Sequence, residues 1–188
     1  IKEGDKAKGL ICLVSGKLKV FRIGVGGREQ IIKLVRQNGF IGYRTLFSES
    51  RYPVSAAAIE DSLVCVIEKS ALVKILKQNA DLAFKFMKII TEELSFSNNR
   101  MVSLSQKHVR GRIAESLLVL RDTYGLEADG KTLPVALSRE DIAHLSNMTT
   151  SNAIRTLSSM ATEGLIIIEG RKIRLNDVNE IERISEHG

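Results

Sequence analysis

Residues 79–110 contain neither glycine nor proline, and this uninterrupted stretch constrains the fold more than any other feature. Apolar or small side chains recur through it at alternating spacings of four and three residues, at Ala83, Met87, Ile90, Leu94, Ser97, Met101 and Leu104. This heptad pattern predicts a helix of roughly 28 residues, about 42 Å long. A helix of that length extends beyond a small domain. We therefore expect it to pair with a second copy of the chain through Met87, Ile90, Leu94, Ser97, Met101 and Leu104. A helix packed only on its own domain is the alternative.

Residues 1–68 carry the pattern of a small antiparallel β domain. Short apolar or alternating runs are separated by turns that contain glycine, and they are Leu10–Val14, Leu18–Ile23, Gln30–Val35, Val54–Ile59 and Leu63–Ile67. This spacing is typical of a sandwich or barrel. We expect hairpins at Ser15–Lys17 and Gly26–Arg28. Beyond the strands, Ser70 is expected to cap a short helix, Ala71–Gln78.

Residues 108–188 predict two helices joined by a tight turn and followed by a hairpin. The expected elements are a helix Gly111–Tyr124, a short strand Leu133–Leu137, a helix Asp141–Leu145 capped by Ser138, a turn Ser146–Met148, a helix Thr150–Glu163 capped by Thr149, a hairpin Leu165–Leu175 and a terminal helix Asp177–Ser185. Ala143 is small where the two short helices must cross. Apolar side chains are expected to fix the crossing angle, and they are Ile142, Leu145, Ala153, Ile154 and Leu157. This is the order of elements in a winged helix-turn-helix.

The start of the second short helix is polar and carries no acidic residue, which favours contact with nucleic acid. Such side chains can donate to phosphates and to base edges, and a helix N-terminus itself favours an anion. We expect Arg155 to read a base, while Ser138, Arg139 and the basic hairpin tip hold phosphates. The complete candidate set is Ser138, Arg139, Thr149, Thr150, Ser151, Asn152, Arg155, Arg171 and Lys172. A winged helix that binds protein instead is the alternative.

The net charge of +6 and the pI near 9.4 are weaker arguments for DNA binding than they first suggest. Residues 1–107 hold 18 basic and 10 acidic residues, whereas residues 108–188 hold 10 basic and 12 acidic residues. The positive excess therefore lies outside the predicted DNA-binding region. A slightly acidic domain should bind random DNA weakly, so we expect tight binding to depend on dimerisation.

The motifs together resemble the Crp/Fnr family of transcription regulators. The matching stretches are Glu3–Leu10, Leu13–Val20, Gly39–Gly42, Leu46-Phe47, Ala58–Ser62, Gly111–Ala114, Leu137–Ala143 and Glu163–Ile166. The resemblance implies an α+β fold: a cyclic-nucleotide-binding-type β-roll (a jelly roll) over residues 1–78, a dimerisation helix over 79–108, and a winged helix-turn-helix over 109–188. It also implies a cytoplasmic homodimer that binds a two-fold operator on double-stranded DNA and contacts RNA polymerase. The resemblance starts partway into a typical member, so we expect further residues to precede Ile1.

Two departures argue against cyclic AMP as the effector. Members that bind it carry a glutamate after the glycine that matches Gly42, where this chain has Tyr43. They also carry an arginine–serine pair where this chain has Tyr52–Ser55. A phosphate pocket needs donors to replace lost water, and the ribose needs its carboxylate. The candidates for contact with some other small molecule are Gly42, Tyr43, Arg44, Thr45, Ser55, Ser97 and Asn98. A regulator with a vestigial, ligand-free pocket is the alternative.

The recognition helix departs from the family as well. The best-known members use an arginine–glutamate pair and a later arginine, and the matching residues here are Thr150, Ser151 and Arg155. Because only Arg155 is retained, the operator of those members is not expected here.

Other functional classes lack support in the sequence. Cys12 and Cys65 lie far apart and are interpreted as small apolar strand residues, and His108, His144 and His187 share no metal-like spacing. No cofactor is therefore assigned. No catalytic triad or phosphate loop is readable, so we do not expect an enzyme. No apolar run reaches the roughly 18 residues of a membrane helix. A cyclic-nucleotide sensor without a DNA-binding role is a further alternative, but it would have no use for the helix-turn-helix.

Overall fold

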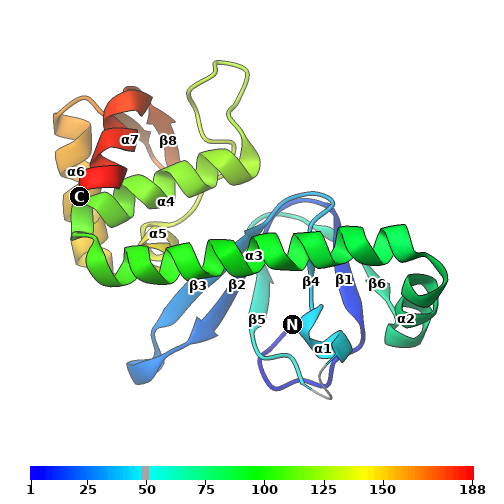
Figure 1. The fold of residues 1–188 in the computed structure, drawn as a ribbon. Helices are drawn as coiled ribbons and strands as arrows, with labels where there is room; N and C mark the ends of the chain where they lie inside the picture. The colour runs from blue at the N-terminus through cyan, green and yellow to red at the C-terminus, as the bar shows by residue number, and fades with distance from the viewer. Residues whose placement is uncertain (48–50) are drawn as a thin grey trace. The chain divides into compact units, whose positions relative to one another are not determined.

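The structure is a computed structural model that describes residues 1–47 and 51–188. The described chain forms two compact units, residues 1–22 with 32–101 and residues 102–188 with 23–31, so that the long helix is divided between Met101 and Val102. For the description of the fold we call residues 1–101 the β-roll unit and residues 102–188 the C-terminal domain (Figure 1). The domain boundaries expected after residues 78 and 108 stay a prediction.

The β-roll unit consists of two antiparallel three-stranded sheets, a short helix between two of their strands, and two helices that follow the strands. One sheet has the order β4-β1-β6 and the other the order β3-β2-β5. The strands are β1 (Leu10–Ser15), β2 (Leu18–Ile23), β3 (Glu29–Val35), β4 (Phe40–Ile41), β5 (Ser55–Ala58) and β6 (Leu63–Ile67). The helices are a short α1 (Arg44–Phe47), then α2 (Lys69–Gln78) and α3 (Ala80–Gln106). These bounds confirm the expected strands to within a few residues.

Of the two predicted hairpins, only the second is present. Gly24–Arg28 joins the paired strands β2 and β3, through the 3-10 turn η1 (Val25–Gly27). The prediction at Ser15–Lys17 was wrong, because β1 and β2 belong to different sheets. Gly16, at φ +92°, instead turns the chain from one sheet to the other, and a Cβ there would collide with Ser62. A glycine turn therefore does not by itself distinguish a hairpin from a crossover.

Two apolar clusters stabilise the β-roll unit. Alternate residues of the strands meet between the sheets with the ring of Tyr52, and the buried members of this cluster are Ile11, Leu13, Leu18, Val20, Val35, Ile41 and Tyr52. On the outer side of β1, Leu10 packs with Leu72 of α2 and Phe86 of α3. The Phe86 ring stacks on Phe40 with centroids 5.2 Å apart. The second cluster holds the start of α3 along the sheet (Figure 1).

The helices α2 and α3 begin differently from the sequence prediction in one respect. Ser70 is not a cap, because α2 already begins at Lys69 with Glu68 as its N-cap. Asn79 caps α3, since its Oδ1 accepts from the backbone N–H of Leu82 at 2.9 Å. α3 spans 27 residues, close to the predicted length.

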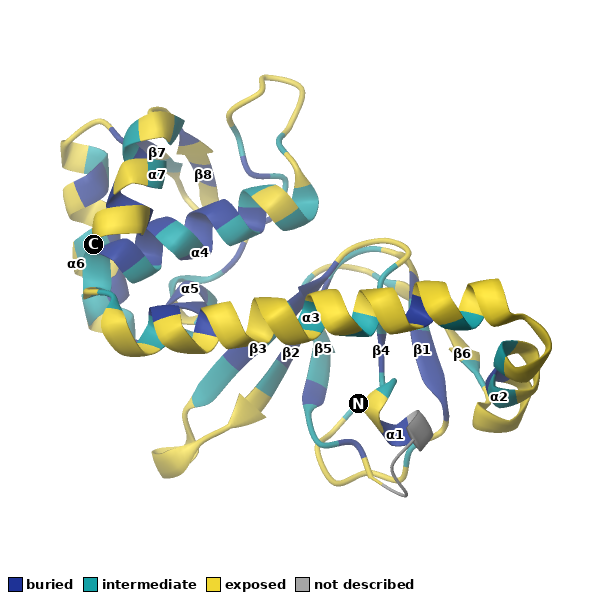
Figure 2. Cartoon of the chain, in the orientation of Figure 1, coloured by how far each residue is buried: buried dark blue, intermediate teal, exposed yellow. Residues whose placement is uncertain are grey.

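The C-terminal domain is built around the buried helix α4 (Val109–Tyr124), which packs against α7 (Val178–His187). In the sequence, α4 and α7 are separated by three elements. These are α5 (Arg139–Leu145), α6 (Thr150–Thr162) and the hairpin of β7 (Ile166–Glu169) and β8 (Lys172–Leu175). Figure 2 shows the contrast between the mostly buried α4 and the mostly exposed α3. The order of elements is the predicted winged helix-turn-helix.

The expected strand Leu133–Leu137 is not a strand. Thr132 forms an isolated bridge with Arg174, and the N–H of Leu133 donates to Ile173 at 2.9 Å. Pro134 has no N–H, so the ladder cannot continue through it. The segment nevertheless buries alternate side chains, Leu133, Val135 and Leu137. It therefore supplies core residues without completing the sheet.

No helix in the described part of the chain combines the length and apolar character that a membrane crossing requires.

Candidate nucleic-acid interface

The turn between α5 and α6 is fixed by polar contacts on both sides. Ser138 and Asp141 form a capping box at the start of α5. At the turn, Asn147 adopts φ +51°, and its carbonyl oxygen accepts from Arg112 of α4 at 2.8 Å. The buried hydroxyls of Ser146 and Ser116 lie 2.8 Å apart and join the end of α5 to α4. These hydrogen bonds hold the turn and the end of α5 against α4.

The apolar contribution to the crossing of α5 and α6 comes from most of the predicted residues but not from all of them. Ile142, Ala143, Leu145, Ala153 and Leu157 are buried. Ile154 is 47% exposed, so its predicted role in the core was wrong. It lies one residue before Arg155, and both side chains are exposed on α6.

The exposed side of α6 carries the central candidates for base contact. Thr149 caps the helix by accepting from the backbone N–H of Asn152 at 3.3 Å. Ser151 and Arg155 are exposed one turn apart, and Ile154 lies beside them. Thr150 and Asn152 are half-buried. No acidic residue occurs in the first turn of α6. This side of the helix can donate hydrogen bonds, present a cation and offer one apolar contact.

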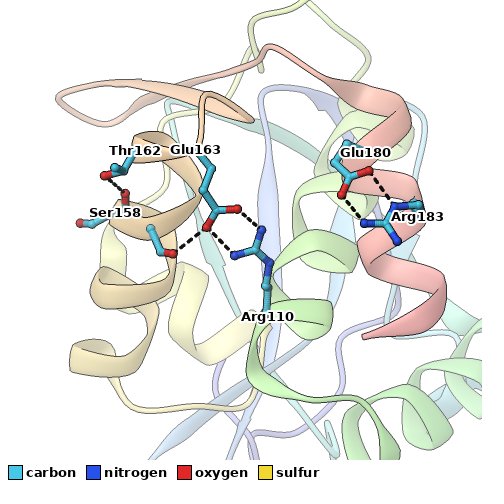
Figure 3. A network of polar contacts seen from close by, with 7 residues as sticks. Arg110, Ser158, Thr162, Glu163, Glu180 and Arg183 are labelled. Atoms are coloured by element: carbon cyan, nitrogen blue, oxygen red, sulfur yellow. Dashed lines mark hydrogen bonds and ion pairs between the residues drawn. The ribbon is translucent and has the colours of Figure 1, made fainter.

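The acidic residue that follows α6 in the sequence is held at the opposite end of the helix. Glu163, the C-cap of the helix, pairs with Arg110 of α4 and accepts from Ser159 at 2.8 Å (Figure 3). These contacts, led by the Arg110 guanidinium, lower the pKa of Glu163 to about 2. In the same view Glu180 pairs with Arg183 on α7, which lowers the pKa of Glu180. Both carboxylates are therefore matched with arginines away from the start of α6.

The hairpin tip is a two-residue turn that presents a basic side chain. Gly170 has φ +60°, as the first central residue of such a turn requires, and Arg171 beside it is exposed. Lys172 is also exposed, and its ammonium lies 3.5 Å from Glu127. Of the two tip cations, Arg171 is therefore the more available to a partner.

Arg139 joins the start of α5 to this hairpin. Its Nη2 donates to the carbonyl oxygen of Gly170 at 2.7 Å. Its Nη1 is buried and finds no acceptor among the described residues. Ser138 is less available, because its hydroxyl donates to Asp141 at 2.7 Å and accepts from the backbone of the same residue. The structure thus brings Ser138, Arg139 and the hairpin tip together, with a spare donor on Arg139.

Sequence reasoning overlooked three residues of this region. The contacts of Arg112 and Arg110 could not be read from the sequence, since each acts on a partner more than 30 residues away. Ile154 was assigned to the core on composition, although Ala153 and Leu157 already complete the buried stripe. A helical wheel places Ile154 with Ser151 and Arg155, and that signal was available in the sequence.

The candidate effector residues of the β-roll are used by the domain itself. Thr45 is buried and donates to the carbonyl oxygen of Gly42 at 2.6 Å. Ser55 is buried and accepts from the N–H of Glu3 at 2.9 Å. A Cβ at Gly42 would lie 3.2 Å from the Tyr52 ring, so this ring fills the space beside the glycine. The Tyr52 hydroxyl accepts from the N–H of Lys8 at 3.1 Å.

Tyr43 belongs to a separate polar cluster between the sheet and α3. Lys33 pairs with Glu93 of α3 and also lies 5.6 Å from the centroid of the Tyr43 ring. Burial and the neighbouring Glu93 raise the pKa of Tyr43 to about 12, although Arg44 opposes the shift. Tyr43 is therefore neutral at physiological pH and takes part in anchoring α3.

Ser97 and Asn98 are exposed on α3, as are several predicted dimer residues. Met87, Leu94 and Met101, at every seventh position, are 51%, 61% and 66% exposed. Ile90 and Leu104 are only partly exposed, and Ile90 packs against the cluster around Leu10. The heptad pattern thus divides: Met87, Leu94 and Met101 face solvent, whereas Ile90 packs within the β-roll unit.

Comparison with known proteins identifies both units. Residues 1–79 match the family model of the cyclic nucleotide-binding domain, and residues 111–184 match the Crp-like helix-turn-helix domain. An anaerobic regulatory protein of Bacillus subtilis is 29% identical over 89% of this chain and 71% of its own length. A CRP-like cAMP-activated global transcriptional regulator of Mycobacterium tuberculosis is 25% identical over 96% of this chain and 81% of its own length.

Solved structures agree on the fold. FixK2 from Bradyrhizobium japonicum is 22% identical, with a TM-score of 0.83 over 97% of this chain and 93% of its own. A CRP-family transcriptional regulator from Thermus thermophilus is 23% identical, with a TM-score of 0.84 over 100% of this chain and 92% of its own. Both units and their order along the chain therefore match these structures.

Proposed function

Because the chain belongs to the Crp/Fnr family of DNA-binding transcription regulators, we propose that it acts as a homodimer whose two α6 helices enter successive major grooves of a two-fold operator. The observation that carries this proposal is the exposed, acid-free side of α6, where Ser151, Ile154 and Arg155 lie together. Arg155 would donate to a guanine, and the Ile154 side chain would meet a thymine methyl. Arg139 and Arg171 would hold the flanking phosphates.

The experiment that tests this proposal is selection of bound duplexes from a randomised DNA library, at a stated salt concentration. We expect a two-fold site with half-sites about one helical turn apart. Arg155→Ala should lower affinity for the selected site by about 10-fold or more while leaving affinity for random duplex nearly unchanged. Arg183→Ala is the matched control, because it removes the same charge from α7. Equal losses on both duplexes would contradict base reading by Arg155.

The phosphate contacts should behave differently in the same assay. Arg171→Ala should weaken binding to selected and random duplexes alike, and it should reduce the dependence of affinity on salt by about one counterion per site. A loss confined to the selected duplex would assign Arg171 to base reading instead.

The exposed row of α3 supports dimerisation through this helix. Met87, Leu94 and Met101 leave three large apolar side chains in water at heptad spacing, as expected of one strand of a coiled coil. Leu94→Glu should shift the chain to a monomer in sedimentation velocity, because two carboxylates would face each other across the seam. Asn99→Glu is the matched control, since Asn99 is exposed on α3 outside the seam. A monomeric wild-type chain, or a dimer that survives Leu94→Glu, would contradict this interface.

The β-roll supports a regulator that does not bind cyclic AMP. Tyr52 packs against Gly42, and the hydroxyls of Thr45 and Ser55 already bond within the domain. This arrangement favours the ligand-free alternative over a small-molecule effector. Isothermal titration of the dimer with cyclic AMP should show no heat of binding. Measurable binding would contradict the ligand-free alternative and support a sensing pocket in the β-roll. In either case the dimer would work in the cytoplasm, where it would meet both its operator and RNA polymerase.

A further inference from the structure

Cys12 and Cys65 occupy directly opposite positions on neighbouring strands. Cys12 lies on β1 and Cys65 on β6, and the register of this antiparallel pair places the two residues across from each other. Both thiols are free. Directly opposed residues of a β ladder project from the same face, so the two sulfur atoms are neighbours although 53 positions separate them in the sequence. The earlier interpretation of both as ordinary apolar strand residues is therefore incomplete.

The distance between the two Cα atoms is compatible with a disulfide, whereas the distance between the two Cβ atoms would make that disulfide strained. Opposed Cα atoms in an antiparallel pair lie about 4.5 or 5.5 Å apart, within the range that disulfides span. Their Cβ atoms lie about 4.5–5.5 Å apart, somewhat beyond the roughly 3.8 Å typical of a bridge. Closing this gap requires the two strands to shift slightly.

The strand β6 is able to make that shift. It stands at the end of the order β4-β1-β6, so β1 is its one strand neighbour among the described residues. The register also changes between Leu13 and Ser15, just beyond the cysteine pair. An edge strand next to such an irregularity is less constrained than a central one.

The two thiols differ in access, which sets the order in which they would react. Cys65 is exposed, whereas Cys12 is partly buried and packs with Phe40 against the cluster of Leu10, Leu72 and Phe86. Burial, and then the adjacent Cys65, raise the pKa of the Cys12 thiol. An oxidant from solution therefore meets Cys65 first, and Cys12 is placed to react only with a neighbour.

We propose that Cys12 and Cys65 form a reversible redox site that closes to a cross-strand disulfide by exchange with a low-molecular-weight disulfide. The Cys65 thiolate attacks one sulfur of the small disulfide, forming a mixed disulfide and releasing one small thiolate. The Cys12 thiolate then attacks the sulfur of Cys65 and releases the second small thiolate. The two cysteines lose two electrons and two protons, and the small disulfide is reduced to two thiols.

The strain in such a bridge makes it easy to reduce. Strained and accessible disulfides have more oxidising potentials than buried structural ones, and these are the bridges that open and close with the surrounding thiol pool. The bridge would join β6 to the strand that carries Leu10, whose side chain packs against α3 through Phe86. Oxidation would therefore stiffen the sheet beneath the start of α3.

The test is incubation of the folded, full chain with oxidised glutathione, followed by acid quench, alkylation and intact-mass measurement. We expect the wild-type chain to become lighter by two hydrogen atoms, to take up no alkyl group and to retain no glutathione. Reduced glutathione in excess should restore both alkylation sites. Peptide mapping should recover the β1 and β6 segments as one linked fragment from a single chain.

The single variants separate this bridge from ordinary surface oxidation. Cys12→Ala should hold a stable glutathione adduct on Cys65, because no second thiol is there to displace it. Cys65→Ala should react more slowly, because Cys12 is partly buried. A stable adduct on wild-type Cys65, a bridge between two chains, or a bridge that forms only in urea would each overturn the proposal. Circular dichroism of the oxidised chain shows whether the bridge formed in the folded state or only in the unfolded chain.

Discussion

The C-terminal domain and the β-roll unit use their polar side chains for opposite purposes. On α6, Ser151 and Arg155 are exposed, beside an exposed Ile154. In the β-roll, Thr45, Ser55 and Tyr52 are buried and bonded to nearby backbone groups. An exposed polar group contributes little to folding and can be selected for a partner. A buried one must be satisfied internally, and it then stabilises its own domain.

The largest effects are expected from substitutions in the two cores, which test whether the two units are stabilised separately. Leu117 of α4 is 0% exposed, and Leu117→Ala should lower the free energy of unfolding of the C-terminal domain by about 2–5 kcal/mol. Leu13→Ala should have a similar effect in the β-roll unit, where Leu13 is 1% exposed. Hydrogen exchange followed by mass spectrometry assigns each loss to its own peptides. If either substitution lowered protection equally in both units, they would unfold as one, and the comparison would lose its basis.

The sequence predicted the C-terminal domain well because its signals are local. Ser138 and Thr149 cap the helices they were expected to cap, and Gly170 forms the expected hairpin turn. Each depends on residues a few positions away. The prediction failed at Pro134, which ended a ladder that alternation alone suggested, and at Ile154, which is exposed rather than in the core.

The β-roll was harder to predict because its determining contacts are distant in sequence. The crossover at Gly16 depends on Ser62, and the space beside Gly42 is filled by Tyr52. Neither partner could be identified from spacing, since apolar alternation gives the face of a strand but not its neighbour. For the same reason the alignment of Cys12 with Cys65 emerges only from the register of β1 and β6.

Smaller effects are expected when one buried and one exposed polar group are removed in turn, and these distinguish the two kinds of group directly. Tyr52→Phe keeps the ring but leaves the N–H of Lys8 without its acceptor, so it should lower the free energy of unfolding by about 1–3 kcal/mol. DNA affinity of the folded dimer should not change. Ser151→Ala should show the reverse, with stability changed by less than about 0.5 kcal/mol and weaker operator binding. Urea denaturation and fluorescence anisotropy measure the two quantities. A stability loss from Ser151→Ala as large as that from Tyr52→Phe would contradict the division of roles.

The smallest expected effect is a pH dependence at the far end of α6. The Arg110 contact lowers the pKa of Glu163 from 4.5 to about 2, so the folded state favours the ionised carboxylate. This contribution to stability is present above pH 4.5, and it is lost as pH falls toward 2. Glu163→Gln should therefore flatten the fall in Tm across that window. Its effect at neutral pH should be small, because the pair is exposed and a negative charge opposes the helix dipole at this end.

Glu180→Gln provides the control for this measurement, since Arg183 lowers the pKa of Glu180 on α7 and leaves α6 untouched. Only Glu163→Gln removes an ion pair that joins α6 to α4, so only this variant should also increase hydrogen exchange in the last turn of α6 at neutral pH. The N-terminal turn, where Ser151 and Asn152 lie, should keep its protection. Loosening that reached this turn would mean that the recognition surface is held from the C-terminal end of α6, and not by the Thr149 cap and the α5 crossing alone.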